Sequence, residues 1–412
     1  MSALQAQSLA GLLALAGLAW VIGGCGRVSW RILVAGLGGQ LLLGAALLHL
    51  PPLRAAFAAI GRAVDGLAVA TRAGTALVFG YLGGAPPPFE VLRPGADFVL
   101  FFQALPLILV VGALSAVLYH WRILPLVVGA ISRAVRAAFG LSGAAGLSVA
   151  ANVFVGMVEA PLLIRPWLAG LSRPELFVVM VAGLATISGN MLVVYAMMIS
   201  QVVPDAAGQL LAASLIATPA AVLAALLMVP GATTQATPDP VPPRLYESTL
   251  DALLKGISDG LTLMLSIMAA LVVFVALVAL GNMILEPLTG LTLQTVAGWV
   301  FRPLALAMGV PWAESGIVGA SLGTKIVVNE FVAYLEMATS GGLGLTPRSR
   351  LILTYALCGF TNFASLGIML AGMGAMCPER RADILALGPR SLLAAAIACC
   401  MAGATVGVLT AP

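Results

Sequence analysis

Charged residues are scarce in this chain: Asp, Glu, Lys and Arg together make up 9% of its 412 residues. A soluble protein of this length needs roughly 25% charged residues to cover its surface. The hydrophobic fraction is instead 61%, and the mean hydropathy is +1.08. The outer surface must therefore face lipid. The sequence predicts an all-α, multi-pass membrane protein that has the bilayer as its immediate surroundings.

Metal-binding side chains are also rare. The histidines are His49 and His120, and the five cysteines lie in or near apolar segments without metal-type spacing. A Cys/His metal site is therefore not expected, and neither is a cofactor. The net charge of +4 comes from arginines that mostly flank apolar stretches. Because the chain has no basic tract and no basic face interleaved with aromatics, nucleic acid is not an expected partner.

Apolar stretches of membrane-spanning length recur along the chain. A bilayer core of about 30 Å requires about 20 apolar residues per helix. We predict about eight spanning helices, at 7–24, 30–50, 97–118, 175–199, 207–229, 260–284, 350–373 and 388–409. Residues 53–75 and 287–310 are interrupted by Arg, Gly and Pro, so they are expected to be interfacial helices or bent connectors. Residues 121–140 are expected to present a basic interfacial face.

The distribution of arginines predicts the orientation. "LAWVIGGC", which ends at Cys25, loosely imitates a lipoprotein cleavage site, but no Lys or Arg precedes Arg27 to form a positive n-region. A first membrane helix with its N-terminus outside fits better, with Arg27 and Arg31 at its cytoplasmic end. "PERR" at 378–381 predicts another cytoplasmic loop, so the C-terminus is also expected outside the inner (plasma) membrane.

Two segments, 142–171 and 313–340, are long, moderately apolar and broken near the middle by small or polar residues. We interpret both as re-entrant hairpins, because irregular backbone at membrane depth is tolerated where protein or water covers it. The predicted organisation is N-terminal scaffold helices and an interfacial helix at 1–96, a first repeat at 97–230, a loop at 231–250 and a second repeat at 251–412. "GLATIS" (183–188) and "GFTNFA" (359–364) follow the two hairpins at matching positions, which indicates an inverted repeat and a midplane site.

Several polar side chains interrupt these apolar segments. The hairpins contain Asn152, Glu159, Asn329 and Glu330, and the helices after them contain Thr186, Ser188, Asn190, Asn362 and Ser365. Ionisable groups at membrane depth are functional candidates by default, and oxygen-bearing groups such as these suit hard monovalent cations and sugar hydroxyls. Structural alternatives remain: Glu159 could pair with Arg165 and Glu330 with Lys325, hydroxyls could bond to their own helix, and the asparagines could join helices.

The motifs in order resemble the concentrative nucleoside transporter family, and the similarity runs from about residue 30 to 409. They are "GTALVFGYLGG" (74–84), "AANVFVGMVEAPLLIRPWL", "ELFVVMVAGLATISG", "GTKIVVNEFVAYL" and "YALCGFTNFASLGI". The resemblance implies a homotrimer whose protomers each have a scaffold domain and a transport domain. The transport domain would carry both hairpins and two partly unwound helices, and its elevator-like displacement would import a nucleoside down a sodium or proton gradient.

The resemblance also implies the site residues. Glu330, Asn362 and Ser365 match the family's ribose-binding positions, and Phe360 would pack on the nucleoside. The family's sodium site carries over onto Asn152, Val155, Thr186 and Ile187. Where family members read the base with "GQTE" or "GQSE", this chain has "GMVE": Glu159 is kept, whereas Met157 and Val158 replace hydrogen-bonding side chains. Discrimination between bases should therefore change, and Asn190 is a candidate to compensate.

Rival functions are less consistent with the sequence. A transporter of the same fold could carry a modified nucleoside or another small metabolite, because of "GMVE". A membrane enzyme with Glu330 or Glu159 as a general base lacks a metal-binding acidic pair, nucleophile–base spacing and a sizeable polar domain. A passive channel would need a ring of pore-lining residues rather than two broken, substrate-sized segments.

Overall fold

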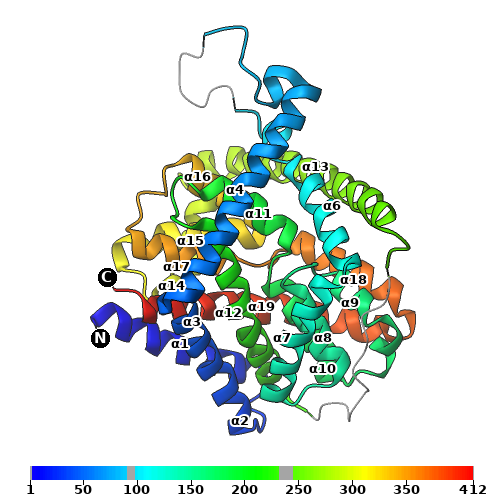
Figure 1. Ribbon diagram of the computed structural model, residues 1–412. Coiled ribbons are helices and arrows are strands. Elements are labelled where there is room, and N and C mark those ends of the chain that lie inside the picture. The colour runs from blue at the N-terminus through cyan, green and yellow to red at the C-terminus, as the bar shows by residue number, and fades with distance from the viewer. Residues whose placement is uncertain (1, 91–97, 232–244, 412) are drawn as a thin grey trace.

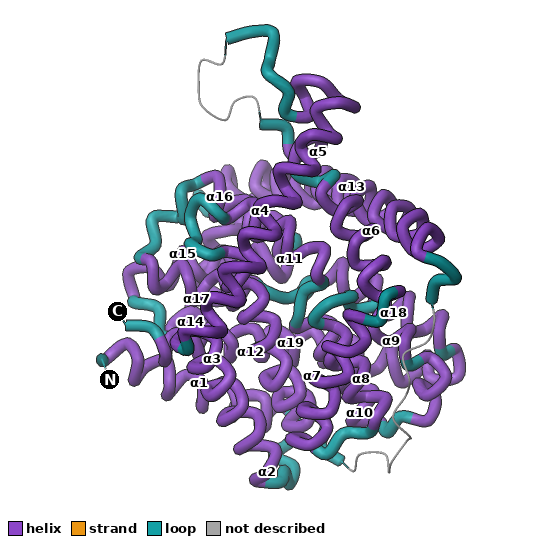
Figure 2. Tube along the Cα trace, in the orientation of Figure 1, coloured by secondary structure: helices purple, strands orange, loops and turns teal. Residues whose placement is uncertain are grey.

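The computed structural model describes residues 2–90, 98–231 and 245–411, and all the regular structure in these ranges is helical (Figures 1 and 2). The helices are α1 Ala3–Ile22, α2 Trp30–Leu33, the π-helix η1 Val34–Gly38, α3 Gly39–His49, α4 Pro51–Phe79, η2 Gly80–Gly83, α5 Leu100–Gln103, α6 Leu107–His120, α7 Ile123–Phe139, α8 Gly143–Asn152, α9 Glu159–Leu163, η3 Arg165–Gly170, α10 Arg173–Ala185, α11 Gly189–Ile199, α12 Ala206–Met228, α13 Thr249–Thr289, α14 Leu293–Ala307, α15 Trp312–Val327, α16 Glu330–Thr339, α17 Pro347–Leu357, α18 Phe363–Met376, η4 Pro378–Arg380 and α19 Arg381–Leu409.

The centre of the molecule is formed by α10, α12 and α19. These three helices pack against one another, and α1, α17 and α18 pack on α19, which crosses the middle of the body in Figure 1. Residues Pro174–Ala185 of α10 are all buried. Small residues permit this close packing of helices where lipid removes the usual hydrophobic driving force. The most hydrophobic part of the core therefore surrounds the point where α10 ends.

The periphery is apolar as well. α13 is 41 residues long, and its side chains include exposed Val272, Leu277 and Leu280. Among the described residues, seven helices are long and apolar enough to span a membrane, or up to eight if the bent pair α14 and α15 counts as one span. These findings confirm a multi-pass membrane protein. The predicted stretches at 175–199 and 350–373 are each divided into two helices, α10 with α11 and α17 with α18.

Two predicted boundaries are wrong. α13 continues through Pro287 to Thr289, so the connector predicted from residue 287 begins in a spanning helix; α14 starts only at Leu293. A proline three residues from a C-terminus disturbs few remaining helical bonds, which allows α13 to continue. The predicted loop at 231–250 ends early because the Ser248 hydroxyl accepts the backbone N–H of Asp251 and starts α13. Residues 232–244 of that loop lie outside the described residues.

The predicted interfacial segments at 53–75 and 121–140 are helical, as α4 and α7. α4 begins with Pro51 and Pro52 in its first turn, where a missing backbone N–H costs nothing. Arg133 of α7 is exposed, while Val128 and Val135 of the same helix are buried. Leu126 and Val127 of α7 are also exposed, however, and Arg136 packs against Gly146, so α7 does not show the predicted basic face.

Glycines bring α6 and α13 into backbone contact. A Cβ atom built on Gly256 would lie 2.7 Å from both the Ala113 Cα and the Gly112 carbonyl oxygen. At Gly260, a Cβ would lie 3.0 Å from the Ile108 carbonyl oxygen. Backbone atoms cannot yield to a methyl group as the end of a flexible side chain can. The two helices therefore depend on the absence of side chains at this crossing.

Replacing Gly256 with alanine is expected to destabilise the protein by about 1–3 kcal/mol, because the added methyl group overpacks the crossing of α6 and α13. Thermal unfolding of the purified protein in detergent measures the change. Gly66→Ala in α4 is the matched control, since a Cβ there meets nothing within 4 Å and alanine favours a helix. Equal unfolding temperatures for the two variants would contradict this account of the crossing.

Candidate functional site

Four non-helical stretches lie inside the helical body (Figure 2). Residues 153–158 separate α8 from α9, and residues 328–329 separate α15 from α16. Residues 186–188 and 358–362 interrupt the helices that follow. The stretch 153–158 contacts the start of α11, directly after the stretch 186–188, because the Gly189 N–H donates to the Phe154 carbonyl oxygen at 2.9 Å. In each half of the chain, a pair of helices joined by a turn precedes a helix that is interrupted in its middle, as the repeated sequence motifs predict. We call the pairs α8–α9 and α15–α16 the helix–turn–helix segments, and α10–α11 and α17–α18 the broken helices.

A cavity of about 220 Å³ lies between these stretches and α13. This volume is several times the ~30 Å³ share of one liquid water molecule, so a small organic molecule can enter. All the predicted substrate-binding residues line it: Met157, Val158, Glu159, Asn190, Glu330, Phe360, Asn362 and Ser365. The structure therefore brings together residues that are separated by about half of the chain. A larger hollow of about 650 Å³ beside α4 contains none of them.

Two side-chain hydrogen bonds hold Glu330 in this cavity. Its Oε1 accepts the Tyr195 hydroxyl at 2.7 Å, and its Oε2 accepts the Asn362 Nδ2 at 2.8 Å. The side chain is 4% exposed, and it begins α16, where the positive end of the helix dipole favours a carboxylate. Each carboxylate oxygen keeps a further acceptor position. Glu330 can therefore accept hydrogen bonds from ligand hydroxyls without moving.

Helix capping explains why these polar residues stand where they do. The Asn329 Oδ1 accepts the backbone N–H of Val332, which starts α16 with Glu330 as its first residue. The Asn362 Oδ1 likewise accepts the backbone N–H of Ser365 at 2.7 Å and starts α18. Because that bond fixes the Asn362 amide, its NH₂ group points at Glu330. The local signals that start two helices therefore also build the site.

The "GMVE" turn is packed tightly on both halves. A Cβ on Gly183 of α10 would lie 3.3 Å from the Met157 Cβ, and one on Gly372 of α18 would lie 3.0 Å from the Val158 Cγ1. Gly156 has φ +115°, and a Cβ on it would lie 2.7 Å from the Glu159 Oε2. Met157 and Val158 thus give the cavity an apolar wall, while the Glu159 side chain stays exposed within it.

Asn190 faces two cavities. It lines the substrate-sized cavity and a neighbouring one of about 180 Å³ that also contains Glu159 and Asp259. Its Oδ1 accepts the Ser115 hydroxyl of α6 at 3.2 Å. This bond matches the expectation that asparagines join helices. It also directs the Asn190 NH₂ group away from Ser115, so the residue can both join α6 to α11 and donate to a ligand.

Of the predicted cation-binding residues, one lines the cavity and three do not. Asn152 is 1% exposed, and neither its Oδ1 nor its Nδ2 has a hydrogen-bond partner. An unpaired buried amide costs about 1–3 kcal/mol, which singles this side chain out among the predicted cation-binding residues. Thr186 and Ile187 are buried at the end of α10, and Val155 lines the cavity. The Thr186 hydroxyl donates to the Ala182 carbonyl oxygen, which is the back-bonding expected of a hydroxyl in its own helix.

The structural alternatives for the two glutamates are wrong. Among the described residues, Glu159 forms no ion pair with Arg165, which is exposed. Glu330 forms none with Lys325, whose Nζ instead donates to the Ala356 carbonyl oxygen at 2.8 Å. Neither carboxylate is therefore occupied by a structural cation of the chain, and both remain available to a ligand.

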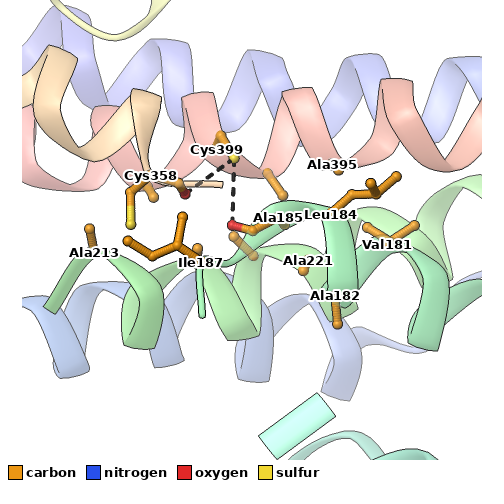
Figure 3. Packing of buried hydrophobic residues seen from close by; sticks show 14 of the residues in the cluster. Val181, Ala182, Leu184, Ala185, Ile187, Ala213, Ala221, Cys358, Ala395 and Cys399 are labelled. Carbon is orange, nitrogen blue, oxygen red and sulfur yellow. Dashed lines mark hydrogen bonds between the residues drawn. The ribbon is translucent and has the colours of Figure 1, made fainter. Parts of the chain in front are cut away.

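The two broken helices meet at Cys399 of α19. The Cys399 Sγ donates to the Ala185 carbonyl oxygen and to the Cys358 carbonyl oxygen, both at 3.6 Å, as Figure 3 shows. These carbonyls are freed where α10 and α17 end. A Cβ on Gly359 would lie 2.8 Å from the same Ala185 oxygen. The interruptions of the two halves therefore share one contact point.

Sequence reasoning missed two polar residues of this region. The first, Tyr195, is fully buried. It lies one helical turn after Met191 and two turns after Ser188, and all three residues line the cavity. Its aromatic hydroxyl inside an apolar span is the sequence signal that could have indicated it. Ser148 is buried one turn before Asn152 on α8, and its hydroxyl also lacks a partner. Its position four residues before an intramembrane asparagine could have indicated it.

Comparison with protein-family models matches nearly the whole chain. Residues 209–407 match a model described as the C-terminus of the Na⁺-dependent nucleoside transporter, and residues 10–82 match the corresponding N-terminus. Residues 101–202 match a model described as nucleoside recognition. These matches include both helix–turn–helix segments and both broken helices.

Named relatives and solved structures support the same comparison. The nucleoside permease NupC of Helicobacter pylori is 31% identical over 412 residues, covering 97% of each chain. The sodium/nucleoside cotransporter 1 of Rattus norvegicus is 34% identical over 93% of this chain and 60% of its own length. The solved structure of CNTnw in an inward-facing, substrate-bound state has a TM-score of 0.91 and 34% identity, covering 98% of this chain and 99% of that one. Outward-facing and intermediate structures of CNTnw variants match with TM-scores of 0.90 and 0.89.

Proposed function

Because the chain belongs to the sodium-dependent nucleoside transporter family, we propose that it imports nucleosides by symport with a cation, sodium or proton. Family members and solved neighbours are transporters rather than enzymes. The observation that carries the substrate proposal is the Glu330 carboxylate, which is fixed by Tyr195 and Asn362 and lines a cavity of about 220 Å³. Ribose hydroxyls are suitable donors for such an acceptor.

The base would bind beside the apolar wall formed by Met157, Val158 and Phe360. Such a wall provides contact area but few hydrogen bonds to distinguish one base from another, so we assign the reading of a base edge to the Asn190 amide. Competition of uridine, adenosine and free ribose for uptake tests this assignment. Competition by ribose as effective as that by both nucleosides would contradict a role for the wall in binding the base.

The cation would bind at Asn152, Val155, Thr186 and Ile187, between the first helix–turn–helix segment and the first broken helix. The unpaired Asn152 amide supports this assignment, because its oxygen is a suitable ligand for a hard monovalent ion. We further propose that the two helix–turn–helix segments are re-entrant hairpins and that they move together in an elevator-like step. The transporter would be a homotrimer. The matched CNTnw conformations support alternating access.

The proposed orientation places both termini outside the inner membrane. The Gln5 Nε2 donates to the Val408 carbonyl oxygen, so the two ends of the chain lie on the same side, as Figure 1 shows. The Arg390 guanidinium donates to the Ile22 carbonyl oxygen at the other end of α1. Arg27 therefore lies on the same side as the start of α19, in agreement with cytoplasmic positive charge.

Initial uptake of labelled uridine into proteoliposomes tests the proposed function. We expect uptake to be stimulated by an inward sodium gradient, and a proton gradient of equal size identifies the alternative coupling ion. No uptake of uridine or adenosine under either gradient, by protein that is folded and inserted, would contradict nucleoside symport.

Asn152→Ala is expected to lower the apparent sodium affinity of uptake by about 10-fold or more, since it removes an amide oxygen whose bond to a charged partner contributes about 1.5–3 kcal/mol. The measurement is uridine uptake as a function of sodium concentration at constant ionic strength. Asn282→Ala is the control, because Asn282 bonds to Gln294 at a distance from the cavity. An unchanged sodium dependence of Asn152→Ala would remove this residue from the cation site.

A further inference from the structure

Lys325 is a buried cation that the proposed transport reaction does not use. The chain contains two lysines: Lys255 is exposed and pairs with Asp251, whereas Lys325 is 2% exposed near the end of α15. Among the described residues, no carboxylate lies within 4.0 Å of the Lys325 Nζ. A buried ammonium costs several kcal/mol of desolvation, so its surroundings must compensate for the missing counterion.

The compensation comes from the second broken helix. The Lys325 Nζ donates to the Ala356 carbonyl oxygen at 2.8 Å, and Ala356 is the penultimate residue of α17. The last four carbonyls of a helix lack intrahelical donors, and they form the negative end of the helix dipole. The ammonium therefore lies where a helix that ends inside the protein presents partial negative charge.

The first half has the same arrangement without a built-in cation. Asn152 ends α8, the first arm of its helix–turn–helix segment, and Lys325 lies two residues before the end of α15, the first arm of the other. Each is followed by a broken helix with freed carbonyls. In the first half, however, the Asn152 side chain is buried and has no hydrogen-bond partner. The first half thus has an unpaired buried amide near the end of its first arm, where the second half has a lysine.

We propose that Lys325 is a tethered cation, whose ammonium takes in the second half the place that a monovalent metal ion takes in the first. The chain then binds an external cation in one half only, and the lysine fixes the second helix–turn–helix segment to α17 permanently. The comparison with the first half rests on the proposed function, but the lysine's own role is tested separately from it.

Replacing Lys325 with an oxygen-bearing side chain should create a sodium site. The experiment measures the unfolding temperature of purified full-length protein in sodium chloride and in choline chloride at equal ionic strength. Asn152→Ala is the starting variant, because it removes the proposed first-half site. In this background, Lys325→Gln is expected to unfold several degrees lower in choline than its parent, and sodium is expected to restore a few degrees of that loss.

Three controls separate the charge from the packing. Lys325→Met fills the space without an oxygen and is expected to stay destabilised in both salts. Lys325→Arg keeps the charge and is expected to show no new sodium dependence. Lys255→Gln, at the other lysine of the chain, is expected to change neither the unfolding temperature nor its dependence on sodium. A structural role for the lysine stem alone would not produce sodium dependence in the Gln variant.

Lys325→Gln without sodium-dependent stabilisation would overturn the proposal. So would Lys325→Met as stable as its parent, or Lys325→Gln and Lys325→Ala both unfolded even in sodium chloride. Sodium dependence of the unmodified protein, and its loss in Asn152→Ala, reports on the first-half site alone. If the unmodified protein shows no sodium dependence but Lys325→Gln is stabilised by sodium, the proposed first-half sodium site is rejected and the tethered-cation role of Lys325 is retained.

Discussion

Glu330→Gln is expected to reduce uridine uptake, measured as Vmax/KM, by at least about 100-fold. The Asn362 amide is fixed by its bond to the Ser365 N–H, so it presents donors and would take the single oxygen of a glutamine. The glutamine NH₂ would then face the Tyr195 hydroxyl, and few acceptor positions would remain for the sugar. Two charge-assisted hydrogen bonds of about 1.5–3 kcal/mol each account for this loss.

Two variants make this measurement specific. Glu336→Gln removes the charge of another glutamate in α16, one that lines a separate cavity with Gln294 and Thr324, and it should keep uptake near the parent level. Tyr195→Phe removes one donor to Glu330 and should lower Vmax/KM by about 10-fold. Uptake by Glu330→Gln within a factor of three of the parent would exclude Glu330 as the sugar acceptor.

Gly156→Ala is expected to abolish uptake while leaving the protein folded. Its φ of +115° is unfavourable for a residue with a Cβ, and that Cβ would lie 2.7 Å from the Glu159 Oε2 and 3.3 Å from the Ser188 Cβ. The Glu159 carboxylate can move aside, but alanine does not hold a φ of +115°, so the turn between α8 and α9 must shift, which displaces Met157, Val158 and Glu159 from the cavity wall. Uptake and size-exclusion profile together measure the effect.

Gly140→Ala is the control for a positive φ outside the cavity, in the left-handed region that alanine adopts at lower cost. Gly140 also has a positive φ, +71°, but a Cβ on it meets nothing within 4 Å. We expect this variant to lose about 1 kcal/mol of stability and to transport uridine normally. Loss of uptake in Gly140→Ala, or normal uptake in Gly156→Ala, would show that the turn geometry is not what places the cavity wall.

The sequence predicts the membrane-spanning segments and the constituents of the cavity well, because both depend on local patterns. The lack of charge dictates a lipid-facing surface, and asparagines before Glu330 and Phe363 start helices by capping. The polar residues that sequence patterns single out in the two halves, apart from Asn152 and Thr186, line one cavity. These predictions needed no knowledge of which helices pack together.

Partnerships across the chain could not be predicted in the same way. The partner of Glu330 is Tyr195, 135 positions away, and the partner of Asn190 is Ser115 on another helix. Proximity in the sequence pairs Lys325 with Glu330, whereas the Lys325 Nζ bonds to a carbonyl that is freed where α17 ends. A helix that ends inside the protein presents acceptors that no side-chain pattern shows, and their position depends on the packing of α17 on α19.

The meeting of the two broken helices at Cys399 has a thermodynamic consequence. Ala185 precedes the proposed cation residues Thr186 and Ile187, and Cys358 belongs to the stretch that carries Phe360 and Asn362; one sulfur atom contacts the carbonyls of both. Ordering either stretch around its ligand therefore restricts the other. By linkage, a cation that raises nucleoside affinity by some factor must have its own affinity raised by the same factor. Coupling of the cation to the nucleoside would then arise because the binding of either ligand reduces the backbone freedom of both stretches. The two ligands would favour each other's binding without direct contact.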